Sequence, residues 1–275
     1  MHKHEKKIVG LVLLAFFILG TFLDLNISTF VYNPNVPVVQ FFDQYGQMPC
    51  FGIAAFSFAI LGFTNTRVKK IVRIIGAIIS IILVAFCCYL VSYITASNSM
   101  LLSTVLYSAI AILLAFLVKD KHRVQLRYFA FVSIITAFSQ FFFIRTVKSF
   151  WGRQRFYSIL QDDSLFRPWF APLGKVLDDT YKSFPSGHSG DATVLICLMN
   201  LPLLAHYSGK KYTLIIKLLI YALIVSVMFS RIVFGAHYLT DVTFGASCTY
   251  VIFLIASYIL KKFYRNSQST HQQIP

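Results

Sequence analysis

The sequence predicts an all-α membrane protein, a polytopic bundle of about eight transmembrane helices. The first observation is composition, because 57% of the 275 residues are hydrophobic and only 13% are charged, whereas about a quarter of a soluble domain is charged. The second is that the apolar residues gather in runs that approach the roughly 20 residues needed to cross a bilayer. The third is that these runs are continuous rather than alternating, which argues against a membrane β-barrel.

Eight apolar segments are expected to form the helices. In chain order they are Ile8–Leu25, Pro49–Thr64, Ile71–Ile94, Met100–Val118, Leu126–Val147, His188–Tyr207, Tyr212–Ser230 and Tyr238–Leu260. The first follows a basic start, as in a signal peptide, but no small-residue cleavage site follows Gly20, so it is expected to remain as a helix. The second is the shortest, and a total of six or seven helices is the alternative.

Polar segments separate the later helices. Ser97–Ser99 divides the third from the fourth, and the fifth ends where Lys148 opens a long loop. The sixth follows Pro185, a residue suited to the first turn of a helix. The segment SRIVFGAHYLTD, residues 230–241, joins the seventh helix to the eighth.

The formal net charge of +15 is distributed in a way that indicates topology rather than nucleic-acid binding. With eight helices, one side of the membrane receives Lys3, Lys6, Lys7, Arg67, Lys69, Lys70, Arg73, Lys119, Lys121, Arg123, Arg127, Lys210, Lys211, Lys261, Lys262 and Arg265. Cytoplasmic loops carry such an excess of Lys and Arg, so both termini are expected in the cytoplasm. The partners that this charge favours are anionic lipids.

The loop from Lys148 to Pro185 is an exception on the opposite side, because it retains six basic residues. Binding an anion is the simplest reason for positive charge there. The loop is also rich in Trp, Tyr and Phe. Such residues form either an aromatic belt at the level of the lipid headgroups or a lid over a headgroup, and the sequence leaves both readings open.

Three segments bearing cations and histidines are expected to end on this same face. Lys148 and Arg155 are seven apart in the first, and Arg231 lies in the third. Guanidinium groups match phosphate oxygens in a bidentate way, and lysine adds a point charge. In the second segment Ser186 and Gly187 open a helix, whose first amides lack partners and favour anions.

The histidines supply the candidate chemistry. His237 and Asp241 are four apart, so they share one helix face, and the carboxylate can accept from one ring nitrogen and leave the other free to attack. His188 is then available as a proton donor. Asp191, three residues further on, is expected near that ring, where it would raise the pKa of His188; a first-turn carboxylate favoured by the helix dipole is the alternative.

Each of these signals has a simpler explanation when it stands alone. A single histidine at a helix end is more often a capping or hydrogen-bonded structural residue, and the set of three segments in order is what favours a site. Two histidines and an aspartate are also plausible zinc ligands. Three neighbouring cations would repel a divalent metal, so neither a metal nor a cofactor is expected.

The three segments resemble the signature of the type 2 phosphatidic acid phosphatase superfamily, which includes vanadium haloperoxidases. That signature is Lys, six residues, Arg-Pro; then Pro-Ser-Gly-His; then Ser-Arg, five residues, His, three residues, Asp. The second and third parts match fully here, and the first matches at Lys148 and Arg155. The departure is Phe156, where the family usually has a proline that would stiffen the turn.

The resemblance implies a mechanism and a set of residue roles. His237 would attack phosphorus to form a phosphohistidine, Asp241 would orient it, and His188 would protonate the departing alcohol. The phosphate oxygens would be held by Lys148, Arg155, Ser186, Gly187 and Arg231. No metal would be required.

The resemblance also bounds the domains and the substrate. We expect a single polytopic domain over residues 1–275, with a haloperoxidase-like phosphatase core at 126–260, additional transmembrane helices in 1–125 and a flexible tail at 266–275. The expected function is hydrolysis of a lipid phosphate at the outer face of a bacterial plasma membrane. Candidate substrates are phosphatidic acid, phosphatidylglycerol phosphate and undecaprenyl diphosphate. The alternatives are a lipid phosphotransferase, or a non-catalytic lipid-binding or transport protein on the same scaffold.

Overall fold

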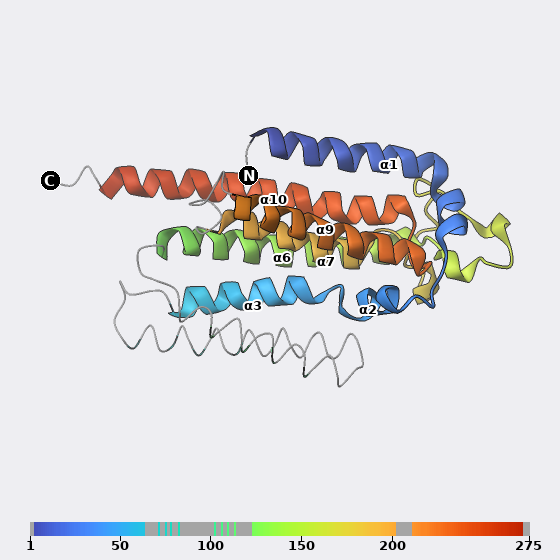
Figure 1. Ribbon diagram of the computed structural model, residues 1–275, viewed down its shortest axis with the longest axis horizontal. Helices are drawn as coiled ribbons and strands as arrows, with labels where there is room; N and C mark the ends of the chain where they lie inside the picture. The colour runs from blue at the N-terminus through green and yellow to red at the C-terminus, as the bar shows by residue number, and fades with distance from the viewer. Residues whose placement is uncertain are drawn as a thin grey trace. The chain divides into compact units, whose positions relative to one another are not determined.

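A computed structural model describes residues 3–63, 123–201 and 211–271, together with eight single positions between 71 and 113. The expected helices Ile71–Ile94 and Met100–Val118 lie almost wholly outside the described residues. All regular elements in the described ranges are helical (Figure 1). They are α1 (Lys3–Val31), α2 (Pro37–Tyr45), α3 (Met48–Phe63), α6 (Arg123–Trp151), η2 (Phe156–Ser158), η3 (Asp163–Leu165), η4 (Asp179–Tyr181), α7 (Gly187–Thr193), η5 (Val194–Asn200), α9 (Lys211–Val233) and α10 (Leu239–His271).

Five of the described helical segments are long and apolar enough to cross a membrane, so the chain is an integral membrane protein. They are Lys3–Val31, Pro37–Gly62, Val124–Trp151, Lys211–Val233 and Leu239–Tyr264. The second of them combines α2 and α3. These five agree in position with the first, second, fifth, seventh and eighth expected helices. The total of eight and the side of the termini stay predictions.

The first helix is longer than expected. It was predicted to end at Leu25, but α1 continues without a break to Val31. The correction has a physical reason, since the Asp24 carboxylate is 2.9 Å from the Arg153 guanidinium and does not need to reach water. The buried residues of α1 are Gly20, Asp24 and Ser28, which are spaced four residues apart. They form a narrow stripe of small and polar residues on one face of the helix.

The sixth expected helix is also different, because it is not one regular α-helix. It begins at Gly187, is α-helical for seven residues and continues as the 3₁₀ segment η5. The Gly-His-Ser-Gly sequence at its start has low helix propensity, and Pro185 precedes the helix rather than beginning it. Residues 202–210 lie outside the described part of the chain.

The chain folds into two compact units. The first comprises Met1–Gln47, Phe138–Thr193 and Ile216–Val251, and the second takes the remaining residues. In the first unit α1 runs antiparallel to α10, because Asp24 contacts Thr240 at one end and the Tyr250 hydroxyl donates to the Lys6 carbonyl at the other. In the second, the Tyr128 hydroxyl donates to the Ser257 carbonyl, 3.0 Å away.

The aromatic loop after α6 belongs to the first unit and is packed onto its helices. The Trp151 and Phe184 rings have centroids 4.6 Å apart, and Phe184 in turn packs on Phe244 of α10. The Trp169 indole N–H donates to the Thr21 hydroxyl of α1 at 3.0 Å. Contacts to both α1 and α10 therefore hold the loop in place, and they fix the backbone that carries the residues described next.

Candidate active site

Three segments distant in sequence meet at the start of α10. The Ser183 amide donates to the Arg153 carbonyl, and the Ser186 amide donates to the Asp241 carbonyl, both at 3.0 Å. Gly245 allows this close approach, since a Cβ there would lie 2.3 Å from the Ser186 carbonyl oxygen. The structure thus brings the loop after α6, the turn before α7 and the α9–α10 connection into one place.

A tight turn after α9 places His237. The amides of Ala236 and His237 both donate to the Arg231 carbonyl at 3.2 Å. Gly235 has φ of +78°, a left-handed conformation that favours glycine. The Gly235 carbonyl also accepts from the Tyr157 amide at 2.9 Å, so the turn is attached to the loop that follows Arg155.

The hydrogen bond of the His237 ring defines which nitrogen is free. Nδ1 lies 2.6 Å from the Ser183 carbonyl oxygen, and the ring is 1% exposed. A carbonyl oxygen can only accept, so Nδ1 carries the hydrogen and donates it. Nε2 therefore keeps its lone pair, which is the form a nucleophile requires.

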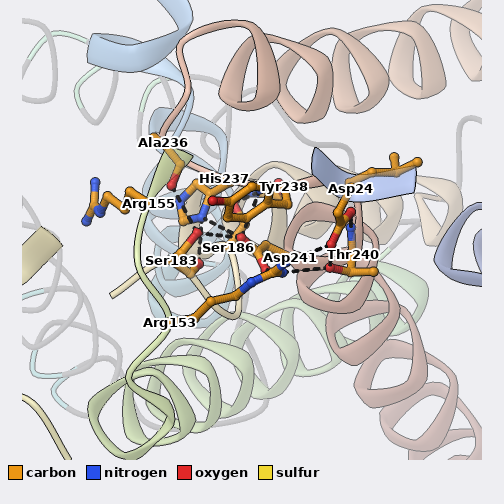
Figure 2. Close-up of polar contacts among 12 residues, drawn as sticks. Asp24, Arg153, Arg155, Ser183, Ser186, Ala236, His237, Tyr238, Thr240 and Asp241 are labelled. Atoms are coloured by element: carbon orange, nitrogen blue, oxygen red, sulfur yellow. Dashed lines mark hydrogen bonds and ion pairs between the residues drawn. The ribbon is translucent and has the colours of Figure 1, made fainter. Parts of the chain in front are cut away.

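Asp241 does not hold His237 in the expected way. Its Oδ2 is 3.8 Å from His237 Nδ1, beyond hydrogen-bonding distance. The carboxylate is bound instead by Arg153 Nη1 at 2.5 Å, by the Ser183 hydroxyl at 2.5 Å and by the Tyr238 amide at 2.9 Å (Figure 2). The correction is that Ser183 stands between the two, with its hydroxyl on Asp241 and its carbonyl on His237.

Burial and neighbouring cations keep the His237 ring neutral. Burial, and then Lys148, lower its pKa well below the usual range for histidine, and Arg231 and Arg155 act in the same direction. Asp241 opposes them and stabilises the charged ring. The imidazole is therefore deprotonated at neutral pH, and the cations surrounding it attract an anion.

The three predicted phosphate-binding cations lie near His237 but differ in their partners. The Lys148 side chain forms no ion pair or hydrogen bond with the described residues. Arg155 Nη2 lies 2.8 Å from Asp179 Oδ2, and in Figure 2 the Arg155 side chain points away from the group around Ser183 and Asp241. Arg231, which is 3% exposed, pairs through Nη1 with the Asp43 carboxylate of α2.

His188 contacts the same turn of α2. Its Nε2 lies 3.0 Å from the Asp43 carbonyl oxygen and 3.1 Å from the Gln47 amide nitrogen. A hydrogen on Nε2 is donated to the carbonyl, whereas a lone pair there accepts from Gln47. Burial, then Arg231 and His237, lower the pKa of His188 well below its usual range. That Asp191 raises this pKa stays a prediction. Asp191 accepts from Gln140 Nε2 at 2.7 Å, and its carboxylate lies 3.7 Å from the Arg145 guanidinium.

Ser186 and Gly187 offer different surroundings at the start of α7. Ser186 is fully buried, and its hydroxyl oxygen accepts from the Ser189 hydroxyl at 3.0 Å. A Cβ added to Gly187 would meet no atom within 4 Å. Space beside Gly187 is thus open, as the predicted anion-binding role requires.

Phe156 stands where the related signature has proline, and it is 3% exposed. Its ring makes edge contacts with Tyr32 of α1 and with Tyr238, at centroid distances of 5.4 and 6.2 Å. The 3₁₀ turn η2 begins at this residue. Aromatic packing therefore anchors the loop after Arg155, where a proline ring would otherwise restrict it.

Several residues of the site were not predicted from the sequence: Asp24, Asp43, Arg153, Ser183 and Thr240. Asp24 had a usable signal, because it is the only charged residue between Lys7 and Asp43, and an ionisable group in an apolar segment is by default a functional candidate. Arg153 lies inside the first motif, but its spacing does not distinguish it from any other basic loop residue. Ser183 acts mainly through its backbone carbonyl, which no sequence pattern reveals.

The comparison with family models assigns the chain to a superfamily. The model of the PAP2 superfamily matches residues 125–265, just over half of the chain, and the chain therefore belongs to this superfamily. Its members are typically phosphatases, and the resemblance drawn from the three motifs is confirmed. No curated protein and no solved structure matches the chain. Within the described ranges no group of three His, Cys, Asp or Glu side chains is placed to hold a metal ion, and metal independence stays a prediction.

Two glycines at the site allow a matched pair of substitutions. We expect Gly245→Ala to lower the free energy of unfolding by about 1–3 kcal/mol, since its methyl group must displace the Ser186 backbone. We expect Gly187→Ala to change stability by less than about 0.5 kcal/mol, because the methyl group meets open space. Thermal unfolding in detergent and titration with inorganic phosphate test this. Unchanged phosphate affinity in Gly187→Ala would argue against contact between this residue and the anion.

Proposed function

We propose that the protein hydrolyses a lipid phosphate or diphosphate monoester through a phosphohistidine, without a metal. The observation that carries the proposal is the state of His237, a neutral ring that donates from Nδ1 and keeps Nε2 free beside three cations. Membership of a superfamily whose members are typically phosphatases supports the same reaction class.

The first step is nucleophilic attack. Nε2 of His237 forms a bond to phosphorus, the P–O bond to the lipid alcohol breaks, and the alkoxide takes a proton from His188. The ring of His237 becomes positively charged at this point, and Asp241 stabilises that charge from 3.8 Å. Lys148, Arg155 and Arg231 neutralise the phosphate oxygens.

The second step releases phosphate. His188, now neutral, removes a proton from a water molecule, the water oxygen bonds to phosphorus, and the P–N bond to His237 breaks. The proton that His188 gains restores the acid for the next cycle. His188 acts as the acid only in its protonated form. Burial and Arg231 disfavour that form in the protein alone, whereas the negative charge of a bound phosphate favours it.

The phosphate group must compete with carboxylates already in place. Asp43 pairs with Arg231, and Asp179 pairs with Arg155. A phosphate monoester carries up to two negative charges against the single charge of each carboxylate, and it matches the guanidinium fork equally well. We therefore infer that substrate binding exchanges these internal ion pairs for contacts with phosphate.

Removal of the nucleophile tests the reaction class. Purified protein is assayed for phosphate release from phosphatidic acid, phosphatidylglycerol phosphate and undecaprenyl diphosphate, with and without chelator. We expect His237→Ala to lose about 1,000-fold or more of kcat, whereas His4→Ala, which removes an exposed histidine of α1, retains activity. Equal release of phosphate by wild type and His237→Ala would overturn the proposal. A phosphorylated lipid product that forms only when a lipid alcohol is added would identify a phosphotransferase.

The pH dependence tests the electrostatics of His237. Because its folded pKa is depressed, the nucleophilic form is present at neutral pH, and kcat/KM should fall only as the pH drops below the usual histidine value of about 6.5. Lys148 is the largest cationic contribution to this depression. We therefore expect Lys148→Met to move the acid limb to higher pH. Using one substrate for both proteins cancels the titration of the substrate itself, and an unmoved limb would contradict the assignment.

We further propose that the site faces the extracytoplasmic side, supported by the positive charge that the sequence places on the opposite side. The test uses two variants, both without the native cysteines. The first carries Leu177→Cys in the exposed loop, and the second carries Lys211→Cys at the start of α9. An impermeant maleimide applied to intact cells should label the first protein and not the second. The reverse pattern would place the site in the cytoplasm.

A further inference from the structure

One buried guanidinium serves two carboxylates beside the proposed nucleophile. Arg153 is 1% exposed, Asp24 is 3% exposed and Asp241 is fully buried. Arg153 Nη1 lies 2.5 Å from Asp241 Oδ1, and Arg153 Nη2 lies 2.9 Å from Asp24 Oδ2. The Arg153 Nε–H donates to the Arg167 carbonyl at 2.9 Å. The guanidinium is thus held in a fixed orientation between α1 and α10.

Asp24 has a second connection to the residues around Asp241. The Thr240 amide in the first turn of α10 donates to Asp24 Oδ1 at 2.9 Å, and the Thr240 hydroxyl donates to Asp24 Oδ2. The same hydroxyl oxygen accepts from Arg153 Nη1 at 2.8 Å. Asp24 therefore fixes both the cation that binds Asp241 and the residue that precedes Asp241 in the chain (Figure 2).

The charge balance gives Asp24 an electrostatic effect in addition to a structural one. With Arg153 alone, the charge of Asp241 would be cancelled by its partner. With both carboxylates ionised, the group of three carries one excess negative charge. That charge becomes favourable when the neutral His237 ring turns positive upon bonding to phosphorus. An interaction that strengthens in the transition state raises kcat rather than substrate affinity.

We propose that Asp24 is a positioning residue for the reaction, acting through Arg153 and Thr240 on Asp241 and, by way of Ser183, on His237. The proposal rests on the phosphatase function proposed above. It assigns a role in the reaction to α1, which lies outside the 125–265 region matched by the superfamily model.

The test compares two carboxylates on the same helix. Glu5 near the start of α1 also pairs with a cation, since its Oε2 lies 3.0 Å from Lys217 Nζ. Asp24→Asn preserves shape and removes charge, and we expect kcat on phosphatidic acid to fall about tenfold to a hundredfold, as for loss of a partner that orients a metal-ligating histidine. We expect KM to stay unchanged. Glu5→Gln should retain the wild-type kcat. Thermal unfolding of both variants reports any general loss of folding.

A second readout separates positioning from simple destabilisation. Orthovanadate accepts a bond from a histidine nitrogen, whereas inorganic phosphate inhibits through the cations alone. Asp24→Asn should weaken inhibition by orthovanadate and leave inhibition by phosphate unchanged. Thr240→Val, which removes the bridging hydroxyl and retains the shape, should give a smaller change in the same direction and serves if Asp24→Asn does not fold.

The energetic coupling between Asp24 and Arg153 tests whether Asp24 acts through Arg153. If Asp24 acts through Arg153, adding Asp24→Asn to Arg153→Lys should reduce kcat little beyond the loss from Arg153→Lys alone. Activity in the wild type, its absence in His237→Ala, and matching kcat for Asp24→Asn and Glu5→Gln would overturn this proposal and leave the phosphatase function intact. No difference between wild type and His237→Ala would overturn both.

Discussion

The position of Arg153 is the constraint on which the rest of the site depends. Its side chain joins α1 to α10, its Nε binds the loop at Arg167, and its backbone carbonyl holds the Ser183 amide. Three charges are buried there together, an arrangement that is tolerated because each has its partners within hydrogen-bonding distance. The orientation of His237 is a secondary result, since its ring is held by the carbonyl of a residue that Arg153 and Asp241 position.

Internal carboxylates occupy the arginines of the site, and this distinguishes those arginines from Lys148. Arg231 is bound to the turn of α2 that also contacts His188, and Arg155 is bound to the loop at Asp179. Lys148 stands among these cations without an ion pair in the described part of the chain. Arg231 and Arg155 are therefore each balanced by one carboxylate, and the ammonium group of Lys148 is the local excess of positive charge among these three cations.

The sequence was sufficient for the helical class, for five helix positions and for the convergence of three motifs, because apolar runs and cation–histidine spacing are local signals. It placed His237 and Asp241 on one helix face but assigned them a direct hydrogen bond. The structure inserts Ser183, whose contribution comes from tertiary contact and a backbone oxygen. The same limit explains Asp24, which was placed at a helix boundary because its partners lie in distant segments. Phe156 filled the place of a proline through packing on Tyr32 and Tyr238, which spacing alone does not encode.

The separation of Asp24 from its partners has a consequence for biosynthesis. Arg153 follows it by 129 residues and Thr240 by 216 residues. An unpaired carboxylate in an apolar helix is costly in the bilayer, and α1 emerges from the ribosome long before either partner is made. Until the final helix has been inserted, the Asp24 carboxylate must therefore lie in water, in the headgroup layer or against a temporary partner. The contacts of Asp24 in the first helix therefore form only after the last helix, which carries Thr240, has been synthesised.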